Sequence, residues 1–306
     1  MNKRILISIV LLVLVLGCLS SEQTLSIEDV DEEAYPLTLH DNQGINVTIL
    51  EEPKRIISIA PSNTEILYAI GASEKIIAVT EYDNYPPEVV GMETIGGFST
   101  VNIERVVSME PDLVFATGGV QTEIVKQLRK LGLVVAVIDA EDIDGILENI
   151  VVVGRISGHQ EEANRLVLDL EKRVEEVRAV TTSTETKPRV MYIVWGDPLM
   201  SAGQGTFIDN IIELAGGENI FQDTNIEYPK VSMESVLEKD PELIIMGDHG
   251  GISIGEMKTN PQWMETTAVK TNSVYEIDGD IVSRQGPRIV DALTQFSAWI
   301  SGNTSE

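Results

Sequence analysis

Short apolar stretches alternate with amphipathic stretches along most of the chain. Runs rich in β-branched residues are typical of buried strands, and they occupy residues 55–59, 76–79, 113–116, 133–138, 190–195, 243–246 and 274–277. Stretches between and after them have helical spacing, at residues 64–70, 102–109, 122–131, 207–215, 233–238 and 288–300. Two further runs, 37–39 and 47–50, flank Asn42-Gln43-Gly44 and predict a hairpin. This alternation predicts an α/β fold with mainly parallel sheets covered by helices.

One region breaks the alternation, because residues 143–180 contain no strand pattern. From Gln160 onward the apolar positions have helical spacing, at Ala163, Leu166, Val167, Leu170, Val174 and Val177. A helix of about 20 residues spans about 30 Å, which is the size of a small domain. We therefore expect a single long helix, within residues 158–182, that joins an N-terminal lobe (35–157) to a C-terminal lobe (183–306).

The two predicted lobes share parts of their sequence. Residues 102–113 align without gaps on residues 232–243, with Glu104 on Glu234 and Pro111 on Pro241. Each lobe also has a glutamate in a predicted helix that ends at glycine, Glu65 in one and Glu213 in the other. Because there are only two copies, the repeat predicts two similar lobes and not a solenoid.

The N-terminus has the pattern of a secretion signal. Lys3 and Arg4 precede an apolar run, residues 5–16, that is too short to cross a bilayer comfortably. The run ends before Cys18, the only cysteine, and residues 1–18 therefore predict a signal peptide with a lipobox-like end. The alternative is an uncleaved signal anchor. Both place the body of the protein outside the cytoplasm and tethered to the membrane, through a flexible acidic segment at residues 19–34.

The charge of the chain makes nucleic acid an unexpected partner. Its formal net charge is -27, and no basic run is present. Acidity of this kind is typical of a soluble surface and points to no particular ligand.

Motifs of nucleotide-binding and metal-dependent enzymes are missing from the sequence. No nucleotide-binding glycine loop occurs, and the three histidines, His40, His159 and His249, have no paired spacing. We therefore expect no catalytic residues and no metal site built by the protein. His249 follows a predicted strand, where it either approaches a metal carried by a ligand or bonds to backbone. A secreted hydrolase and a surface adhesion lipoprotein stay as remote alternatives.

Five ordered segments carry a resemblance to a known family. They are RIISIAPSNTEILYAIGA, EYDNYPPE, IGGFSTVNIERVVSMEPDLVFA, IIELAGGENIF followed by YPKVSMESVLEKDPELII, and RQGPRIVDAL. Together they resemble the binding proteins of ABC importers for cobalamin, ferric siderophores and haem, whose two lobes are bridged by one long helix. SNTE and YDNYPPE look most like the cobalamin branch. The resemblance implies a substrate-binding lipoprotein without a cofactor of its own, whose ligand is a bulky metal chelate: a corrinoid or, alternatively, a ferric siderophore or haem.

The resemblance also implies roles for individual residues. The expected ligand-binding residues in the cleft between the lobes are Trp195, Tyr228, Phe98, Tyr82, Tyr85, Arg284 and Arg288. The matching positions in the family favour Trp195 and Tyr228 over Phe98. For the aromatic residues the alternative is a place in the core, and for the arginines it is a salt bridge to one of the many carboxylates.

Glu65 and Glu213 match the two glutamates with which the family contacts arginine pockets on a pair of membrane subunits. The alternative for each is a solvated helix residue. The implied partners are an ABC permease dimer with its ATPase subunits, and the binding protein itself is expected to be a monomer.

Overall fold

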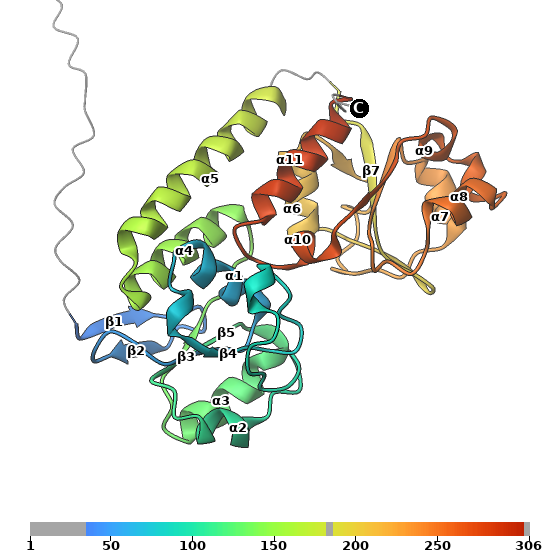
Figure 1. Cartoon of the computed structure of the whole chain (residues 1–306). Coiled ribbons are helices and arrows are strands. Elements are labelled where there is room, and N and C mark those ends of the chain that lie inside the picture. The colour runs from blue at the N-terminus through green and yellow to red at the C-terminus, as the bar shows by residue number, and fades with distance from the viewer. Residues whose placement is uncertain (1–34, 182–185, 303–306) are drawn as a thin grey trace, which may run out of the picture. The chain divides into compact units, whose positions relative to one another are not determined.

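The computed structural model describes residues 35–181 and 186–302. The predicted signal peptide, Cys18 and the acidic tether lie outside the described residues. From Tyr35 onward the chain forms one compact unit that contains two β-sheets flanked by helices and a small two-stranded hairpin (Figure 1).

The N-terminal sheet has four parallel strands in the order β4-β3-β5-β6. Its strands are β3 (Ile56–Ser58), β4 (Ile76–Ala78), β5 (Leu113–Ala116) and β6 (Val135–Val137). Neighbouring residues of a strand point to opposite faces, so Ile56 and Phe115 pack into one hydrophobic cluster, and Ile57 and Val114 into another. All four strands are therefore buried on both sides, which explains why they read as continuous apolar runs.

Helices cover both faces of this sheet. One face carries α1 (Pro61–Ala69) and α4 (Ile143–Ser157), and the other carries α2 (Ile103–Ser108) and α3 (Thr122–Lys130). The hairpin strands β1 (Leu37–His40) and β2 (Asn46–Ile49) are antiparallel, as the sequence predicts. Short 3₁₀ turns follow α1, β4 and β5, at η1 (Ser73–Lys75), η2 (Pro87–Val89) and η3 (Gly119–Gln121).

The C-terminal sheet repeats this design with one antiparallel edge. Its path is β11-β10-β7-β8, and β9 also pairs with β7. The strands are β7 (Arg189–Gly196), β8 (Leu199–Ser201), β9 (Glu218–Asn219), β10 (Leu243–Gly247) and β11 (Val274–Ile277). Strands β7, β10 and β11 are parallel, and β8 runs antiparallel to β7. The sequence pattern does not predict β8 and β9, which have three and two residues.

Helices also cover both faces of the second sheet. One face is covered by α6 (Phe207–Leu214) and α11 (Ile289–Ile300), with α10 (Gly279–Ser283) at its edge. The other is covered by α7 (Met233–Lys239), α8 (Ile254–Thr259), η4 (Trp263–Glu265) and α9 (Thr267–Lys270).

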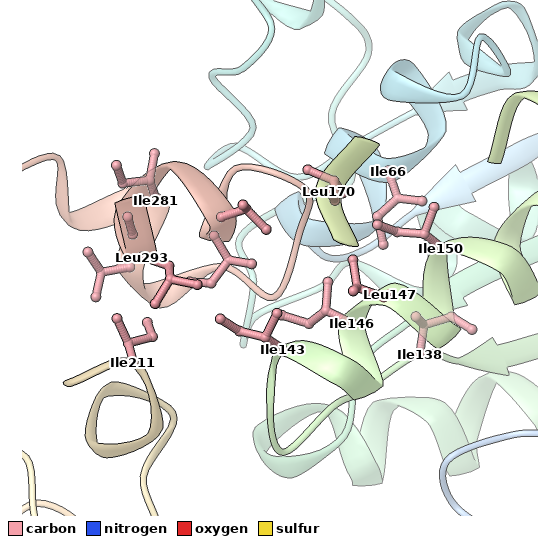
Figure 2. Packing of buried hydrophobic residues seen from close by; sticks show 14 of the residues in the cluster. Ile66, Ile138, Ile143, Ile146, Leu147, Ile150, Leu170, Ile211, Ile281 and Leu293 are labelled. Atoms are coloured by element: carbon pink, nitrogen blue, oxygen red, sulfur yellow. The ribbon is translucent and has the colours of Figure 1, made fainter. Parts of the chain in front are cut away.

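The long helix is α5 (Gln160–Thr181), and it packs against α4, α6 and α11. Its 22 residues span about 33 Å. One buried hydrophobic cluster runs from Ile66 of α1, through Ile146 of α4 and Leu170 of α5, to Ile211 and Leu293 beside the second sheet (Figure 2). The two sheets therefore share a continuous core along the long helix. The exact lobe boundaries at residues 157 and 183 stay a prediction.

The internal repeat is present in three dimensions. Arg55 and Arg189 stand at equivalent places before β3 and within β7, and each backbone N–H donates to a carboxylate of the equivalent pair Asp112 and Glu242. Each guanidinium group also donates to the backbone carbonyls at the end of the repeated helix. Glu110 and Asp240, whose carbonyls accept from these arginines just after α2 and α7, both have positive φ angles, of 47° and 41°. The two lobes thus share local hydrogen bonds as well as sequence.

Candidate functional site

A cavity of about 690 Å³ opens between the two sheets. Its walls come from both halves of the chain: Pro61, Ser62, Glu81, Tyr82, Asn84, Phe98, Ser99 and Thr117 on one side, and His249, Asp280, Ser283, Arg284 and Gln285 on the other. Parallel sheets present ligands at the carboxyl ends of their strands. Pro61, Glu81, Thr117, His249 and Asp280 all follow such ends, after β3, β4, β5, β10 and β11. The fold therefore directs one edge of each sheet into the same cavity.

Hydrogen bonds fix the loops on the N-terminal side of the cavity. The buried Gln121 donates to the carbonyl oxygens of Ile59 (2.6 Å) and Phe98 (2.9 Å) and accepts from the backbone N–H of Thr117 (3.0 Å). Across the cavity, Gln285 exchanges two hydrogen bonds with the backbone of Ala140, at 3.1 and 2.8 Å. The cavity walls are thereby largely fixed before any ligand arrives.

Two of the five predicted aromatic residues line this cavity, Tyr82 and Phe98. Tyr82 is 62% exposed, so its ring is accessible to a ligand in the cavity. The ring of Tyr85 instead packs on the guanidinium group of Arg288. The centre of the ring lies 4.0 Å from the guanidinium carbon.

Trp195 and Tyr228 are not among the lining residues of the cavity. Both are about half exposed, at 45% and 44%, and lie near the β7–β8 end of the second sheet. The indole N–H of Trp195 donates to the carbonyl of Asp197 at 2.8 Å. Ligand contact by Trp195 and Tyr228 stays a prediction, and it requires a ligand that extends beyond the cavity.

The two predicted arginines meet a buried carboxylate. Oε1 of Glu65 lies 2.8 Å from Arg284 and 2.6 Å from Arg288, and Oε2 lies 2.8 Å from Nε of Arg288. The three side chains are only 2%, 10% and 14% exposed. Burial acts to lower the pKa of Arg288, but the hydrogen bonds and charge of Glu65 outweigh it and the pKa is raised. For Arg288, which does not line the cavity, the structure thus favours the salt-bridge alternative over ligand binding.

The burial of Glu65 corrects its predicted role in docking. A side chain that is 2% exposed and paired with two arginines cannot present its carboxylate to a membrane subunit. Glu213, at the end of α6, is exposed, but its counterpart in the other lobe is this buried Glu65. Glu65 and Glu213 are therefore not equivalently exposed, and only the docking role of Glu213 stays a prediction.

A different pair of glutamates has the expected symmetry. Glu104 and Glu234 are both exposed and occupy the second position of α2 and α7. Each helix begins after a capping side chain, Asn102 or Ser232, that accepts from the backbone N–H three residues later. The sequence alignment already sets Glu104 on Glu234, so the repeat itself was the signal for this pair.

A carboxyl group lies buried beneath the Tyr82 loop. Oδ2 of Asp83 accepts from the backbone N–H of Thr80 at 2.8 Å and from its hydroxyl at 2.5 Å, whereas Oδ1 has no hydrogen-bond partner among the described residues. Burial raises the pKa of Asp83, although the hydrogen bonds of Thr64 and Thr80 and the charge of Arg284 oppose the shift.

His249 is the one predicted histidine at the cavity wall. Its side chain is 73% exposed and its Nε2 lies 3.5 Å from Oδ1 of Asp248. The described part of the chain contains no group of three or more histidine, cysteine, aspartate or glutamate side chains that could hold a metal ion. Nor does any helix within residues 35–181 and 186–302 have the length and apolarity to cross a membrane.

Two lobes with parallel sheets, a long connecting helix and a cavity at the facing sheet edges define the class of extracytoplasmic solute-binding proteins. A family model described as periplasmic binding protein matches residues 56–281. This chain belongs to that family, whose members deliver solutes to ABC transporters.

Individual relatives cover most of the chain. The ABC transporter substrate-binding lipoprotein YvrC of Bacillus subtilis is 31% identical over 279 residues, which are 89% of this chain and 88% of that protein. The vitamin B12-binding protein of Vibrio cholerae is 33% identical over 261 residues, covering 84% and 93%. A crystal structure of the periplasmic vitamin B12 binding protein BtuF of V. cholerae superimposes with a TM-score of 0.73, covering 82% of this chain and 99% of that chain. The periplasmic heme-binding protein RhuT of Roseiflexus sp. RS-1 superimposes with a TM-score of 0.72, at 26% identity, covering 81% and 98%.

Proposed function

We propose that this protein captures a corrinoid outside the cytoplasm and delivers it to an ABC permease. The observation that carries the proposal is the cavity at the facing sheet edges, where Tyr82 and Phe98 offer apolar ring faces beside polar groups of the second sheet. Flat aromatic faces suit a macrocycle and lose few rotatable bonds on binding. The relative named a vitamin B12-binding protein, at 33% identity, supports a corrinoid over other chelates.

Haem or a ferric siderophore is the alternative ligand, which the structural likeness to a heme-binding protein supports. Isothermal titration of the purified protein with cyanocobalamin, cobinamide, haemin and two ferric siderophores separates these ligands. We expect one-to-one binding of a corrinoid. Binding of haem or a siderophore without corrinoid binding would replace the proposed ligand, and silence with all five would refute the proposed class of ligand.

In this proposal the protein performs no chemical reaction, and ATP is hydrolysed by the partner ATPase subunits. The stiff helix α5 and the shared core allow only a small change in the angle between the lobes. Capture then depends on a largely preformed cleft, which lowers the entropy that binding has to overcome.

Docking to the permease is proposed to use Glu104 and Glu234. Both are exposed, occupy equivalent helix positions in the two lobes, and match the two-fold relation expected of a pair of permease subunits. In a β-α-β unit the helix runs opposite to its strands, so the first turns of α2 and α7 lie toward the sheet edges that form the cavity. Carboxylate contacts to arginine would give this docking its register.

The docking proposal predicts that Glu104→Ala with Glu234→Ala abolishes corrinoid uptake while binding is unchanged in titration. Uptake is measured in cells that contain the cognate transporter. Glu161→Ala, a change at an exposed glutamate of α5, is the control and should leave uptake intact. Loss of uptake in Glu213→Ala, with normal uptake in the double variant, would return the docking role to Glu213 and refute this assignment.

Membrane attachment through a lipid on Cys18 is proposed from the lipobox-like N-terminus and from a relative that is named a lipoprotein. Metabolic labelling with an alkyne fatty acid should label the wild-type protein and not Cys18→Ala. Equal labelling of both would exclude this anchor.

A further inference from the structure

The guanidinium group of Arg284, at the cavity wall, already has oxygen atoms of the protein as partners. One terminal nitrogen of Arg284 lies 2.8 Å from both Oε1 of Glu65 and Oδ1 of Asn84. The other lies 3.1 Å from the carbonyl of Tyr82 and 2.8 Å from Oδ2 of Asp280. A guanidinium group binds a carboxylate or phosphate best through two parallel N–H groups. Only Nε of Arg284 has no such oxygen neighbour among the described residues, so this two-pronged mode is closed to a ligand.

The second arginine of the cluster is equally engaged. Arg288 makes a two-pronged contact with Glu65, at 2.8 and 2.6 Å, and its face is covered by the ring of Tyr85. Its remaining terminal nitrogen lies 3.4 Å from Oδ2 of Asp278. Arg288 therefore offers no free positive charge toward the cavity.

The local charge balance is negative. Three carboxylates, of Glu65, Asp278 and Asp280, surround the two guanidinium groups. Glu81 adds another carboxylate to the wall, and Arg284 is the only lysine or arginine among the residues that line the cavity. A polyanionic ligand would thus enter a cavity whose one cation is neutralised, and would face repulsion from Glu81 and Asp280.

We propose that Glu65, although it does not line the cavity, makes the cleft selective for uncharged, amide-rich chelates over polyanionic ones. It does so by neutralising Arg284 and Arg288 from beneath the cavity wall and by occupying the N–H groups that would bind an anion. The inference rests on the proposed function, because it assumes that the chelate binds in this cavity. A corrinoid with side-chain amides fits the site, since Nε–H of Arg284 and the second amide N–H of Gln285 and of Asn84, beyond their bonds to Ala140 and Asp280, can donate to amide oxygens. Haem propionates or a ferric tris-catecholate do not fit it.

The test compares dissociation constants for cyanocobalamin, haemin and a ferric tris-catecholate in the wild-type protein and in Glu65→Gln. Glutamine keeps the shape of the side chain and removes its charge. We expect the wild type to prefer cyanocobalamin, and the preference over each anionic chelate to fall on the order of tenfold in Glu65→Gln. Adding Arg288→Gln to Glu65→Gln removes one cation as well and should restore most of the preference. Glu161→Gln, at the exposed surface, should change nothing.

A second variant covers the case in which Glu65→Gln does not fold. Asp280→Asn removes the other carboxylate partner of Arg284 at a partly exposed position and should shift selectivity in the same direction. A wild-type protein that binds the anionic chelates as tightly as cyanocobalamin would overturn the inference, and so would an unchanged preference in both variants. A wild type that binds none of the three would instead contradict the proposed function itself.

Discussion

Close packing at the start of the long helix makes Gly154 a sensitive position. Gly154 is buried in α4, and a methyl group at its Cα would overlap the Cβ atom of Ala163 on α5 and lie 3.1 Å from the carbonyl oxygen of His159. Overpacking of this kind costs about 1–3 kcal/mol, and the better helix propensity of alanine returns up to about 1 kcal/mol. Gly154→Ala should therefore lose about 1–2 kcal/mol of unfolding free energy, which lowers Tm by roughly 2–8 °C for a domain of this size.

Thermal unfolding followed by circular dichroism at 222 nm measures the effect. Gly255→Ala is a matched control for which we expect a gain in stability. Its methyl group would be exposed in α8 and would meet only Oγ of Ser253, at 3.9 Å. It should stabilise the protein by up to about 1 kcal/mol. Adding Ala163→Gly to Gly154→Ala removes the overlap, so the two changes together should cost clearly less than the sum of their separate effects. A Gly154→Ala protein as stable as the wild type, or purely additive effects in the double variant, would refute the close contact between α4 and α5.

Two further predictions concern the core and the buried carboxyl group. Phe296→Ala should lose about 3–5 kcal/mol in urea unfolding, because Phe296 is fully buried and packs on Tyr192 and Trp299; a loss below about 1 kcal/mol would contradict this packing. The second change is Asp83→Asn. Because burial raises the pKa of Asp83, the folded wild type binds this proton more tightly than the unfolded chain does. The wild-type protein therefore loses stability as the pH rises from the unfolded pKa of about 4 through the raised pKa of the folded state. The variant should thus gain stability relative to wild type as unfolding is measured from pH 4 to pH 7, and a flat or opposite difference would contradict the burial of an ionised Asp83.

Local patterns in the sequence predicted much of the fold. The doubly buried strands read as apolar runs, and the apolar positions after Gln160 predicted α5 because a helix repeats every 3.6 residues. The repeat predicted two similar sheets, and the structure adds the equivalent Arg55 and Arg189. Strands β8 and β9 were missed because segments of two or three residues are too short to show the alternation of apolar and polar positions that marks a strand.

The site was harder to predict because its contacts join distant parts of the chain. Glu65 looks like a surface residue when polar side chains are assumed to be exposed, and its partners Arg284 and Arg288 lie 219 and 223 residues away. Tyr82, Phe98 and Arg284 were predicted as cleft residues and do line the cavity, whereas Trp195 and Tyr228, which the resemblance favoured, do not. Glu81, Asn84, Asp280 and Gln285 were not predicted, although the position of Asp280 one helical turn before Arg284 was an available signal.

A crystal structure of the protein with cyanocobalamin would show directly where the ligand binds. We expect the corrin ring to lie between the two sheets, against Tyr82 and Phe98, with side-chain amides near Arg284 and Gln285. A corrinoid bound at another surface, or a cavity that stays empty at saturating ligand, would contradict this expectation.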